Sequence, residues 1–410
     1  MSSSVIEQIR DELVGGAERY ELRRRRVRAA VVAAALVAVL AAGAVAWSAG
    51  DGGGPKVLVQ PQPTTAGPSQ PTVLGPLPGL ERVPSPPGGA ELPVPPIWTG
   101  RELLSVGAYA GGDKEGTLAA FSFDLGKRVW RKVALPPVAI GSGGTTAWTG
   151  KELVVCCGAV PTNSAAAAAY DPASDSWRVL PDAPVHGYVT SVWTGSRVVV
   201  AAPDGVASFD PASNRWTELP APPELASFNK VVRTGRDVAV WPSPATRTVH
   251  GGNTFDFDTG KWSALPAPPQ QSWPAIPDVV SGDGTLFLLG GLPAPGVGSE
   301  RFVAARYDLT TDKWAALPDP LPEPRACECN LGSHVSLWTG RDLLVFVAAL
   351  ASGASTHGVL MAYDPMRDAW RTVGTTSTTA LRPIAMARDR VFLERDGNFY
   401  VSEPGWRPGG

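Results

Sequence analysis

The sequence predicts an all-β protein, a β-propeller of seven four-stranded blades, with six blades as the alternative. Two repeated motifs spread over the C-terminal three quarters of the chain support this fold class. The composition between the motifs supports it as well, because short β-branched runs alternate with Gly, Pro and Asp-Pro turns. An apolar segment and a Pro/Gly-rich stretch precede the repeats, so we also expect one transmembrane helix and a disordered linker ahead of the propeller.

The first motif is an aromatic residue, usually followed by Asp, with Trp seven positions after the aromatic. It begins with FDLGKRVW, which contains Phe123, Asp124 and Trp130, and ends with a degenerate copy, FYVSEPGW. The seven tryptophans lie 36 to 56 residues apart, at Trp130, Trp177, Trp216, Trp262, Trp314, Trp370 and Trp406. Repeats of this length are typical of propeller blades or of paired helices, and the strand-like composition favours blades.

A second motif, WTGRELLSV from Trp98 onwards, recurs between the copies of the first. We expect its Thr-Gly step to form the hairpin between strands 1 and 2 of each blade, because glycine accepts positive φ. Segments such as DPASDS after Tyr170 should form the hairpin between strands 3 and 4, with the Asp carboxylate accepting turn amides. The repeated aromatic and Trp then pack between neighbouring sheets, which is a structural role.

The motifs do not show how the last blade obtains its fourth strand and closes the ring. The chain ends at GWRPGG, where strand 4 of the last blade should begin. The segment LERVPSPP at 80–87 resembles the segments that follow the repeat tryptophans. An outer strand supplied from the N-terminal side is therefore one way to complete the last blade.

These motifs resemble those of the kelch-repeat β-propellers, over about residues 91–408. Repeats of that family carry Gly-Gly after strand 2, then a Tyr-Asp-Pro turn and Trp, and Gly290-Gly291 is the clearest diglycine match here. CCG in the second repeat and AAL in the sixth depart from the pattern, and the seventh repeat lacks both the Asp and the diglycine. The resemblance implies a kelch-type propeller. Some members are copper oxidases, but the tyrosines and histidines of this chain form no matching set, so we predict no cofactor.

The N-terminal region predicts an extracytoplasmic location for the propeller. Residues 29–47 are uncharged, and at about 1.5 Å per residue a helix of this length spans a bilayer. Five arginines between 23 and 28 precede it, which places a leader, 1–28, in the cytoplasm. A cleaved signal peptide ending near AVA at 44–46 is the alternative. Residues 48–90 are then a linker, and 91–408 the ectodomain.

Two further features bear on partners. The leader 1–28 has apolar residues on one helical face and either binds a cytoplasmic partner or is a solvated stem. The chain is slightly acidic, with a formal net charge of −2, and its ectodomain shows no basic stripe, so we expect no nucleic-acid partner. Arginine is much commoner than lysine, which is typical of proteins from high-GC bacteria such as actinobacteria.

The four cysteines lie in two pairs, Cys156-Cys157 and Cys327/Cys329. In an oxidising compartment disulfides are the default. The favoured hypothesis is one or two bridges between the pairs, which would fix the long connection PDPLPEPRACECNLGSHVS, 318–336, as a cap over the ring. The alternatives are local bridges within each pair, a soft metal site of Cys327, Cys329 and His334 with Cys156 or Cys157, or free thiols. No metal is the main expectation.

No phosphate-binding loop, dinucleotide fingerprint or hydrolase motif is present, so no catalytic residue is predicted. His250, His334 and His357, with His186, are expected on the face that carries the 2-3 loops and the 4-1 connections. The sequence thus favours a non-catalytic binding or scaffold module that recognises a protein or a cell-envelope glycan through this face. A carbohydrate-active enzyme of the epimerase or oxidase kind, and a transmembrane regulator signalling through the leader, are the alternatives.

Overall fold

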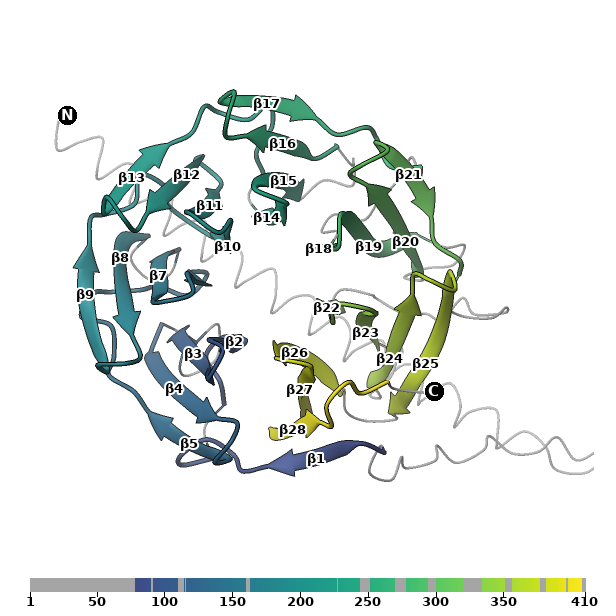
Figure 1. Cartoon of the computed structure of the whole chain (residues 1–410), viewed down its shortest axis with the longest axis horizontal. Helices are drawn as coiled ribbons and strands as arrows, with labels where there is room; N and C mark the ends of the chain where they lie inside the picture. The colour runs from purple at the N-terminus through teal and green to yellow at the C-terminus, as the bar shows by residue number, and fades with distance from the viewer. Residues whose placement is uncertain are drawn as a thin grey trace, which may run out of the picture. The chain divides into compact units, whose positions relative to one another are not determined.

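The protein is a seven-bladed β-propeller whose blades are four-stranded antiparallel sheets, as a computed structural model shows (Figure 1). The structure describes residues 78–89, 91–109, 114, 116–159, 163–226, 228–243, 251–269, 278–293, 300–319, 334–350, 356–376, 381–395 and 397–407. The predicted fold class and the blade count of seven are confirmed. No helix within these ranges could span a membrane, and the leader 1–28 and the apolar segment 29–47 lie outside them.

The blades follow one another in chain order. Blade 1 is β2 (Ile97–Trp98), β3 (Glu102–Ala108), β4 (Leu118–Asp124) and β5 (Val129–Lys132). Blade 2 is β6 (Thr145–Trp148), β7 (Leu153–Gly158), β8 (Ser164–Asp171) and β9 (Ser176–Leu180). Blade 3 is β10 (Thr190–Trp193), β11 (Val198–Ala202), β12 (Gly205–Asp210) and β13 (Arg215–Glu218). Blade 4 is β14 (Phe228–Thr234), β15 (Asp237–Ser243), β16 (Asn253–Asp256) and β17 (Lys261–Ala264).

The second half of the ring continues the same order. Blade 5 is β18 (Asp278–Gly282), β19 (Thr285–Pro293), β20 (Glu300–Asp308) and β21 (Lys313–Ala316). Blade 6 is β22 (His334–Trp338), β23 (Leu343–Leu350), β24 (Thr356–Asp364) and β25 (Ala369–Thr376). Blade 7 is β26 (Arg382–Ala387), β27 (Arg390–Arg395) and β28 (Asn398–Ser402), with β1 (Leu80–Val83) as its outer strand.

The strand β1 closes the ring. It pairs antiparallel with β28, in a register that places Leu80 opposite Ser402 and Val83 opposite Phe399. In Figure 1 it lies at the outer edge of blade 7, next to blade 1. Without it β28 would be an unpaired edge strand. The outer strand from the N-terminal side is therefore confirmed, and the propeller begins inside the segment 48–90 that we predicted to be linker rather than at residue 91.

The apolar core is divided among the seven interfaces between adjacent blades. Strand β19 shows how one strand serves two of them, because Leu286 and Leu288 pack toward blade 4 whereas Phe287 and Leu289 pack toward blade 6. This follows from the alternation of side chains along a strand. Each cluster joins residues of two consecutive blades, so the blades stabilise each other through nearest-neighbour contacts.

The repeat tryptophans lie at these interfaces, as predicted. In blades 1 to 6 the tryptophan is the second residue of the outer strand and packs against the repeat aromatic of strand 3; the Tyr170 and Trp177 rings, for example, are 5.0 Å apart. Each indole Nε1 also donates a hydrogen bond to a backbone carbonyl, which in blades 1 to 6 follows the outer strand of the preceding blade and in blade 7 precedes β1 of the same blade. The acceptors, in blade order, are Pro84, Ala134, Pro181, Pro220, Pro266, Pro318 and, for Trp406, Pro78.

Both hairpin predictions are confirmed. Gly100 of the first Thr-Gly step has a φ of 93°, in the region that only glycine enters at little cost. In the hairpin between strands 3 and 4 of blade 5, the Asp308 carboxylate accepts hydrogen bonds from the amides of Thr310 at 2.8 Å and Thr311 at 3.1 Å. These two amides lower the pKa of Asp308 below its usual value.

A third element of the repeat was not predicted. In the blades whose repeat aromatic is Tyr, the residue five positions later is an Asp that accepts the tyrosine hydroxyl hydrogen bond: Tyr170 to Asp175, Tyr307 to Asp312, and Tyr363 to Asp368. In the first, third and fourth blades the aromatic is Phe, and the corresponding residues are Arg128, Asn214 and Gly260. All six of these residues have positive φ. Positive φ at this position is therefore compatible with several residue types. Asp occurs there in the blades whose aromatic is Tyr, because its carboxylate accepts the hydroxyl hydrogen bond.

Candidate functional site

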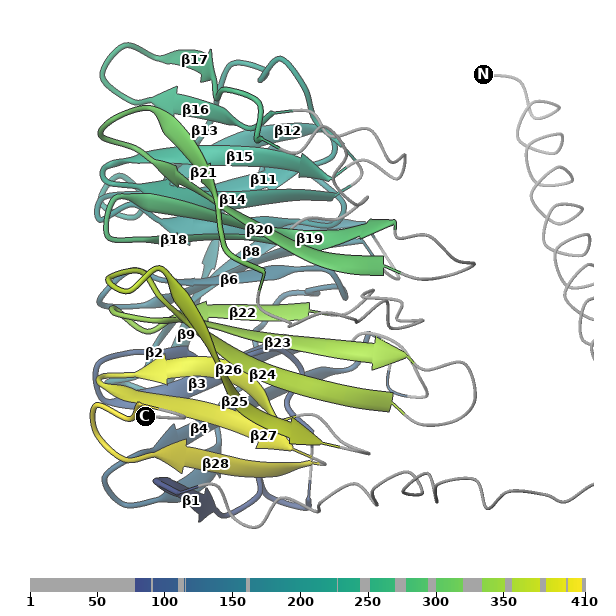
Figure 2. The same ribbon diagram turned by 90° about the vertical axis from the view of Figure 1, so that its right-hand side faces the viewer.

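The two faces of the ring differ in the regularity of their connections. The hairpins between strands 3 and 4 all have the same length, at 125–128, 172–175, 211–214, 257–260, 309–312 and 365–368. These hairpins and the short 1-2 hairpins open on one face, which we call the hairpin face; they are at the left in Figure 2. The 2-3 and 4-1 connections run on the opposite face, the loop face, and range from 203–204 to 317–333. Variation in the chain is therefore concentrated on the loop face.

His186 lies on the loop face, as expected, in the connection 181–189 between blades 2 and 3. Its backbone amide donates to both carboxylate oxygens of Asp204, at 2.9 and 3.1 Å, and its Nδ1 lies 3.0 Å from Asp204 Oδ2. Asp204 is in the turn between β11 and β12, and both side chains are 45% exposed. The carboxylate therefore orients the imidazole at the surface and leaves its Nε2 directed away from the pair.

The other predicted histidines are placed differently. His334 is the first residue of β22 and His357 is the second of β24, so both belong to strands rather than to loops, at strand ends next to the loop face. The reason is that the pairing of β22 with β23 and of β24 with β23 extends further than the repeat suggested, to His334 opposite Val347 and His357 opposite Ala349. His250, Cys327 and Cys329 lie outside the described residues.

The metal alternative receives no support from the residues that the structure describes. Among them, no group of three or more His, Cys, Asp or Glu side chains is arranged to hold a metal ion. Two members of the set considered from the sequence, Cys327 and Cys329, fall outside those residues, so that particular set stays untested.

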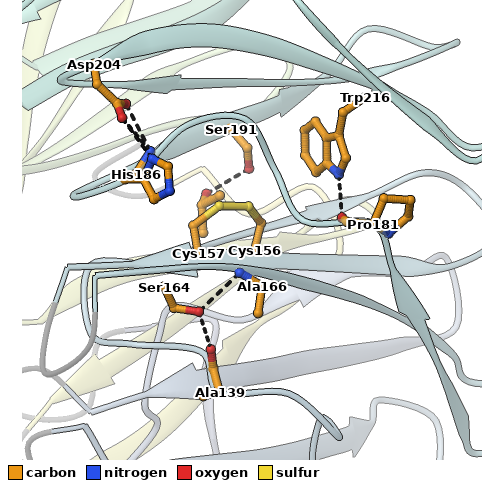
Figure 3. The surroundings of a disulfide bond; sticks show 11 residues. Ala139, Cys156, Cys157, Ser164, Ala166, Pro181, His186, Ser191, Asp204 and Trp216 are labelled. Carbon is orange, nitrogen blue, oxygen red and sulfur yellow. Dashed lines mark hydrogen bonds and ion pairs between the residues drawn. A yellow bond between two sulfur atoms is a disulfide. The ribbon is translucent and has the colours of Figure 1, made fainter.

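Cys156 and Cys157 form a disulfide with each other, at the loop-face end of β7 (Figure 3). This is the local bridge that the sequence left as an alternative, and it differs from the favoured bridge between the two cysteine pairs. Both residues are buried, at 1% and 0% exposure, in the cluster between blades 2 and 3. The β7–β8 register shifts between Cys156 and Gly158, and Cys157 has a φ of 70°. These two residues therefore lie inside the core between blades 2 and 3.

A glycine-rich turn, residues 141–144, packs directly on the disulfide-bonded residues. The amide of Gly141 donates to the carbonyl of Cys157 at 3.1 Å, and the amide of Ala159 donates to the carbonyl of Ser142 at 2.9 Å. A Cβ on Gly144 would lie 2.7 Å from the Cys157 carbonyl oxygen, which is closer than real Cβ contacts allow. Glycine at this position is therefore required by the close approach of the two backbones.

The same turn touches the connection that carries His186. The amide of Val189 donates to the carbonyl of Gly143 at 2.9 Å, and the ring of Tyr188 covers Gly143 so closely that no Cβ would fit there. Tyr188 itself is 41% exposed. The disulfide, the turn 141–144 and the connection 181–189 are thus one connected part of the loop face.

Hydroxyl groups link the innermost strands of blades 2, 3 and 4. The hydroxyls of Thr145 and Ser191 are 2.7 Å apart, across the β6–β10 boundary. The Thr190 hydroxyl donates to the carbonyl of Asn229 at 2.8 Å and accepts from the amide of Val231 at 3.1 Å. The two Thr190 bonds satisfy backbone groups on the inner edge of β14, which no further strand covers.

A charged group continues this series through blades 4, 5 and 6. The Lys230 ammonium lies 3.0 Å from one carboxylate oxygen of Asp278, and the Ser336 hydroxyl donates to the other oxygen. The Asp278 side chain is 15% exposed and that of Lys230 is 43% exposed. One lysine, one carboxylate and several hydroxyls therefore lie near the loop-face ends of the innermost strands, around the axis of the ring (Figure 1).

Sequence reasoning missed this inner set, although a signal exists. Lys230, Asp278 and Ser336 each lie two or three residues before the Trp-Thr-Gly motif or its equivalent. That position is the innermost strand of every blade, so polar residues there mark the axis of the ring. Chemically, the arrangement offers hydrogen-bond donors and acceptors together with the Lys230–Asp278 ion pair.

The described residues of this candidate site thus lie on the loop face of a seven-bladed β-propeller. No protein-family model matches the chain, and none of the curated proteins matches it in sequence.

Proposed function

We propose that this β-propeller is a non-catalytic binding or scaffold module that recognises a protein or a cell-envelope glycan through its loop face. The observation that carries the proposal is the contrast between the two faces: the 3-4 hairpins are uniform, whereas the 2-3 and 4-1 connections vary widely in length and sequence. Connections that run over a rigid scaffold are where binding residues are usually placed. The ring of seven interlocked blades supplies that scaffold.

We also propose that a single-pass membrane anchor holds the propeller at the cell membrane. The uncharged segment 29–47 with arginines before it supports a single-pass anchor, with the leader 1–28 in the cytoplasm and the propeller on the other side. The disulfide within the propeller fits an oxidising compartment. The repeat motifs also support a propeller of the kelch-like type.

Replacing one long loop-face connection tests the binding role. Residues 320–333 make up most of the connection between β21 and β22, and a short Gly-Ser linker in their place leaves both strands intact. We expect this variant to fold but to lose binding to envelope polysaccharide arrays or to a cross-linked envelope protein. Met366→Ser, a change of a 91% exposed residue in a 3-4 hairpin, is the matched control on the hairpin face. Equal binding by the linker variant, or equal loss in both variants, would count against loop-face recognition.

A carbohydrate-active enzyme is the second candidate, and the Lys230–Asp278 pair favours it. A carboxylate that is held by an ammonium and a hydroxyl near the axis of the ring has the residue types that acid–base chemistry on sugars uses. The test is turnover of cell-wall sugars by the unchanged chain and by Asp278→Asn. Turnover that Asp278→Asn abolishes would establish the enzyme, and binding without turnover would leave the binding module.

A further inference from the structure

The disulfide between Cys156 and Cys157 fixes the backbone that supports one part of the loop face. Because the two cysteines are adjacent, their S–S bond closes a small ring that contains the peptide bond between them. The N–Cα bond of Cys157 is a member of this ring, so the disulfide restricts rotation about it. Its φ of 70° lies in the left-handed region, which is costly for a residue other than glycine.

The corresponding position in blade 5 does not share this conformation. Cys157 lies four residues after Leu153, which is opposite the repeat aromatic Tyr170; in blade 5 the residue four positions after Leu286, opposite Tyr307, is Gly290. Gly290 pairs with Val303 in regular register and does not have positive φ, whereas Cys157 lies at the register shift of β7, so the left-handed conformation is particular to blade 2. The disulfide ring holds Cys157 in a conformation that glycine would enter without help.

Three backbone hydrogen bonds connect this conformation to the surface. The Cys157 carbonyl accepts from Gly141, Ser142 accepts from Ala159, and Gly143 accepts from Val189. The last bond reaches the connection that carries His186 and Tyr188. A change of φ at Cys157 moves its carbonyl and therefore disturbs the turn 141–144 and this connection together.

We propose that Cys156–Cys157 is a reversible two-electron redox site that switches this part of the loop face between a fixed and a relaxed state. The reductant is a dithiol, either a thioredoxin-like protein or a small molecule. One donor thiolate attacks a cysteine sulfur and the S–S bond breaks to give a mixed disulfide; the second donor thiol resolves it. The protein gains two electrons and two protons as two thiols, and the donor leaves as its disulfide.

Reduction frees the backbone of Cys157 to return to negative φ. The hydrogen bond from Gly141 is then lost or lengthened, and the turn 141–144 loosens. Since both sulfur atoms are buried, the reductant reaches them only during local opening, so reduction is slow and depends on the stability of this region. The consequence for ligand recognition rests on the proposed function, whereas the switch itself does not.

Hydrogen exchange in the full-length chain tests the switch. Cys327→Ser/Cys329→Ser leaves Cys156–Cys157 as the only cysteine pair, so dithiothreitol acts on it alone. We expect reduction to add two hydrogens to the mass and to speed amide exchange in peptides covering 139–146 and 185–191 by about fivefold or more, the effect of losing an ordinary hydrogen bond. Peptides from blade 5 should not change.

Two further variants in the same background separate the switch from a general loss of stability. Cys156→Ala/Cys157→Gly removes the sulfur atoms but accepts positive φ, so it should resemble the oxidised protein and ignore dithiothreitol. Cys156→Ser/Cys157→Ser should exchange as fast as the reduced protein. Reduction without faster exchange in either peptide, resistance of the folded protein to excess dithiothreitol, or peptide mapping of the unchanged chain that links these cysteines to Cys327 or Cys329 would each overturn the proposal. None of these readouts involves a ligand, so their failure is distinct from failure of the proposed function.

Discussion

The indole Nε1 of Trp130 donates a hydrogen bond of 2.7 Å to the carbonyl of Pro84, 46 residues earlier in the chain. In blades 2 to 6 the same bond joins the tryptophan to a carbonyl just after the outer strand of the preceding blade, as Trp177 does with Ala134. Pro84 comes directly after β1, so the bond marks β1 as the outer strand of blade 7. The ion pair between Arg128 and Glu81 spans the same boundary.

Closure by β1 predicts that the propeller depends on residues ahead of 85. A chain of residues 85–410 lacks the partner of β28 and the buried side chain of Val83, so we expect a lower midpoint of thermal unfolding and self-association through the exposed edge. A chain of residues 69–410 should remain monomeric. Thermal unfolding and size-exclusion chromatography measure both effects. Equal stability of the two chains would show that β1 does not close the ring.

The Tyr–Asp pairs predict a coupled contribution to stability. Tyr170→Phe leaves the Asp175 carboxylate without the hydroxyl that donates to it, and we expect a loss of about 1 kcal/mol in the free energy of unfolding. Tyr170→Phe/Asp175→Asn gives blade 2 the combination that blade 3 has in Phe209 and Asn214. We therefore expect the double variant to lose less than the sum of the two single variants in urea unfolding. Strict additivity would argue against the pairing.

The hairpin aspartates predict lower stability in acid. Asp308 has a lowered pKa in the folded protein because the Thr310 and Thr311 amides donate to it, and Asp256 has one because the Thr259 and Asp258 amides do. A carboxyl group whose folded pKa is below its unfolded value, about 3.9, stabilises the fold above that value. Its contribution is lost as the pH falls through the folded pKa.

Urea unfolding between pH 7 and pH 3 measures this dependence. We expect a nearly constant urea midpoint down to about pH 5 and a fall below about pH 4. Asp308→Asn keeps an oxygen acceptor but does not titrate, so the fall should be shallower in this variant. A variant that retains the full pH dependence would exclude Asp308 as a contributor.

The inner charged group predicts that Lys230 and Asp278 act together. Lys230→Met removes the ammonium that pairs with the largely buried Asp278 carboxylate and leaves the hydrogen bond from Ser336. We expect the free energy of unfolding to fall by about 1 kcal/mol or more. Lys230→Met/Asp278→Asn removes both charges and should recover part of that loss. Chemical denaturation measures both. If the double variant is less stable than Lys230→Met, the pair is not coupled in this way.

The repeat could be predicted from the sequence because it is local. Each blade shows its hairpins and its aromatic pair within a single stretch of chain, such as Tyr170 to Trp177, so the fold class and the number of blades follow from periodicity. The resemblance of residues 80–87 to later segments also indicated β1. The Tyr–Asp relation was present in the sequence as well, but its meaning required the positive φ of Asp175 and its hydrogen bond with the tyrosine.

The candidate site could not be predicted from the repeat, because it is formed by contacts between side chains of different blades. Lys230, Asp278 and Ser336 lie in three different blades, and their association follows from the way that consecutive innermost strands meet around the axis. The pairing of Cys156 with Cys157 was one of several alternatives in the sequence. The tertiary structure decides it, because the two cysteines are bonded to each other and both are buried in the core between blades 2 and 3, at the register shift of β7.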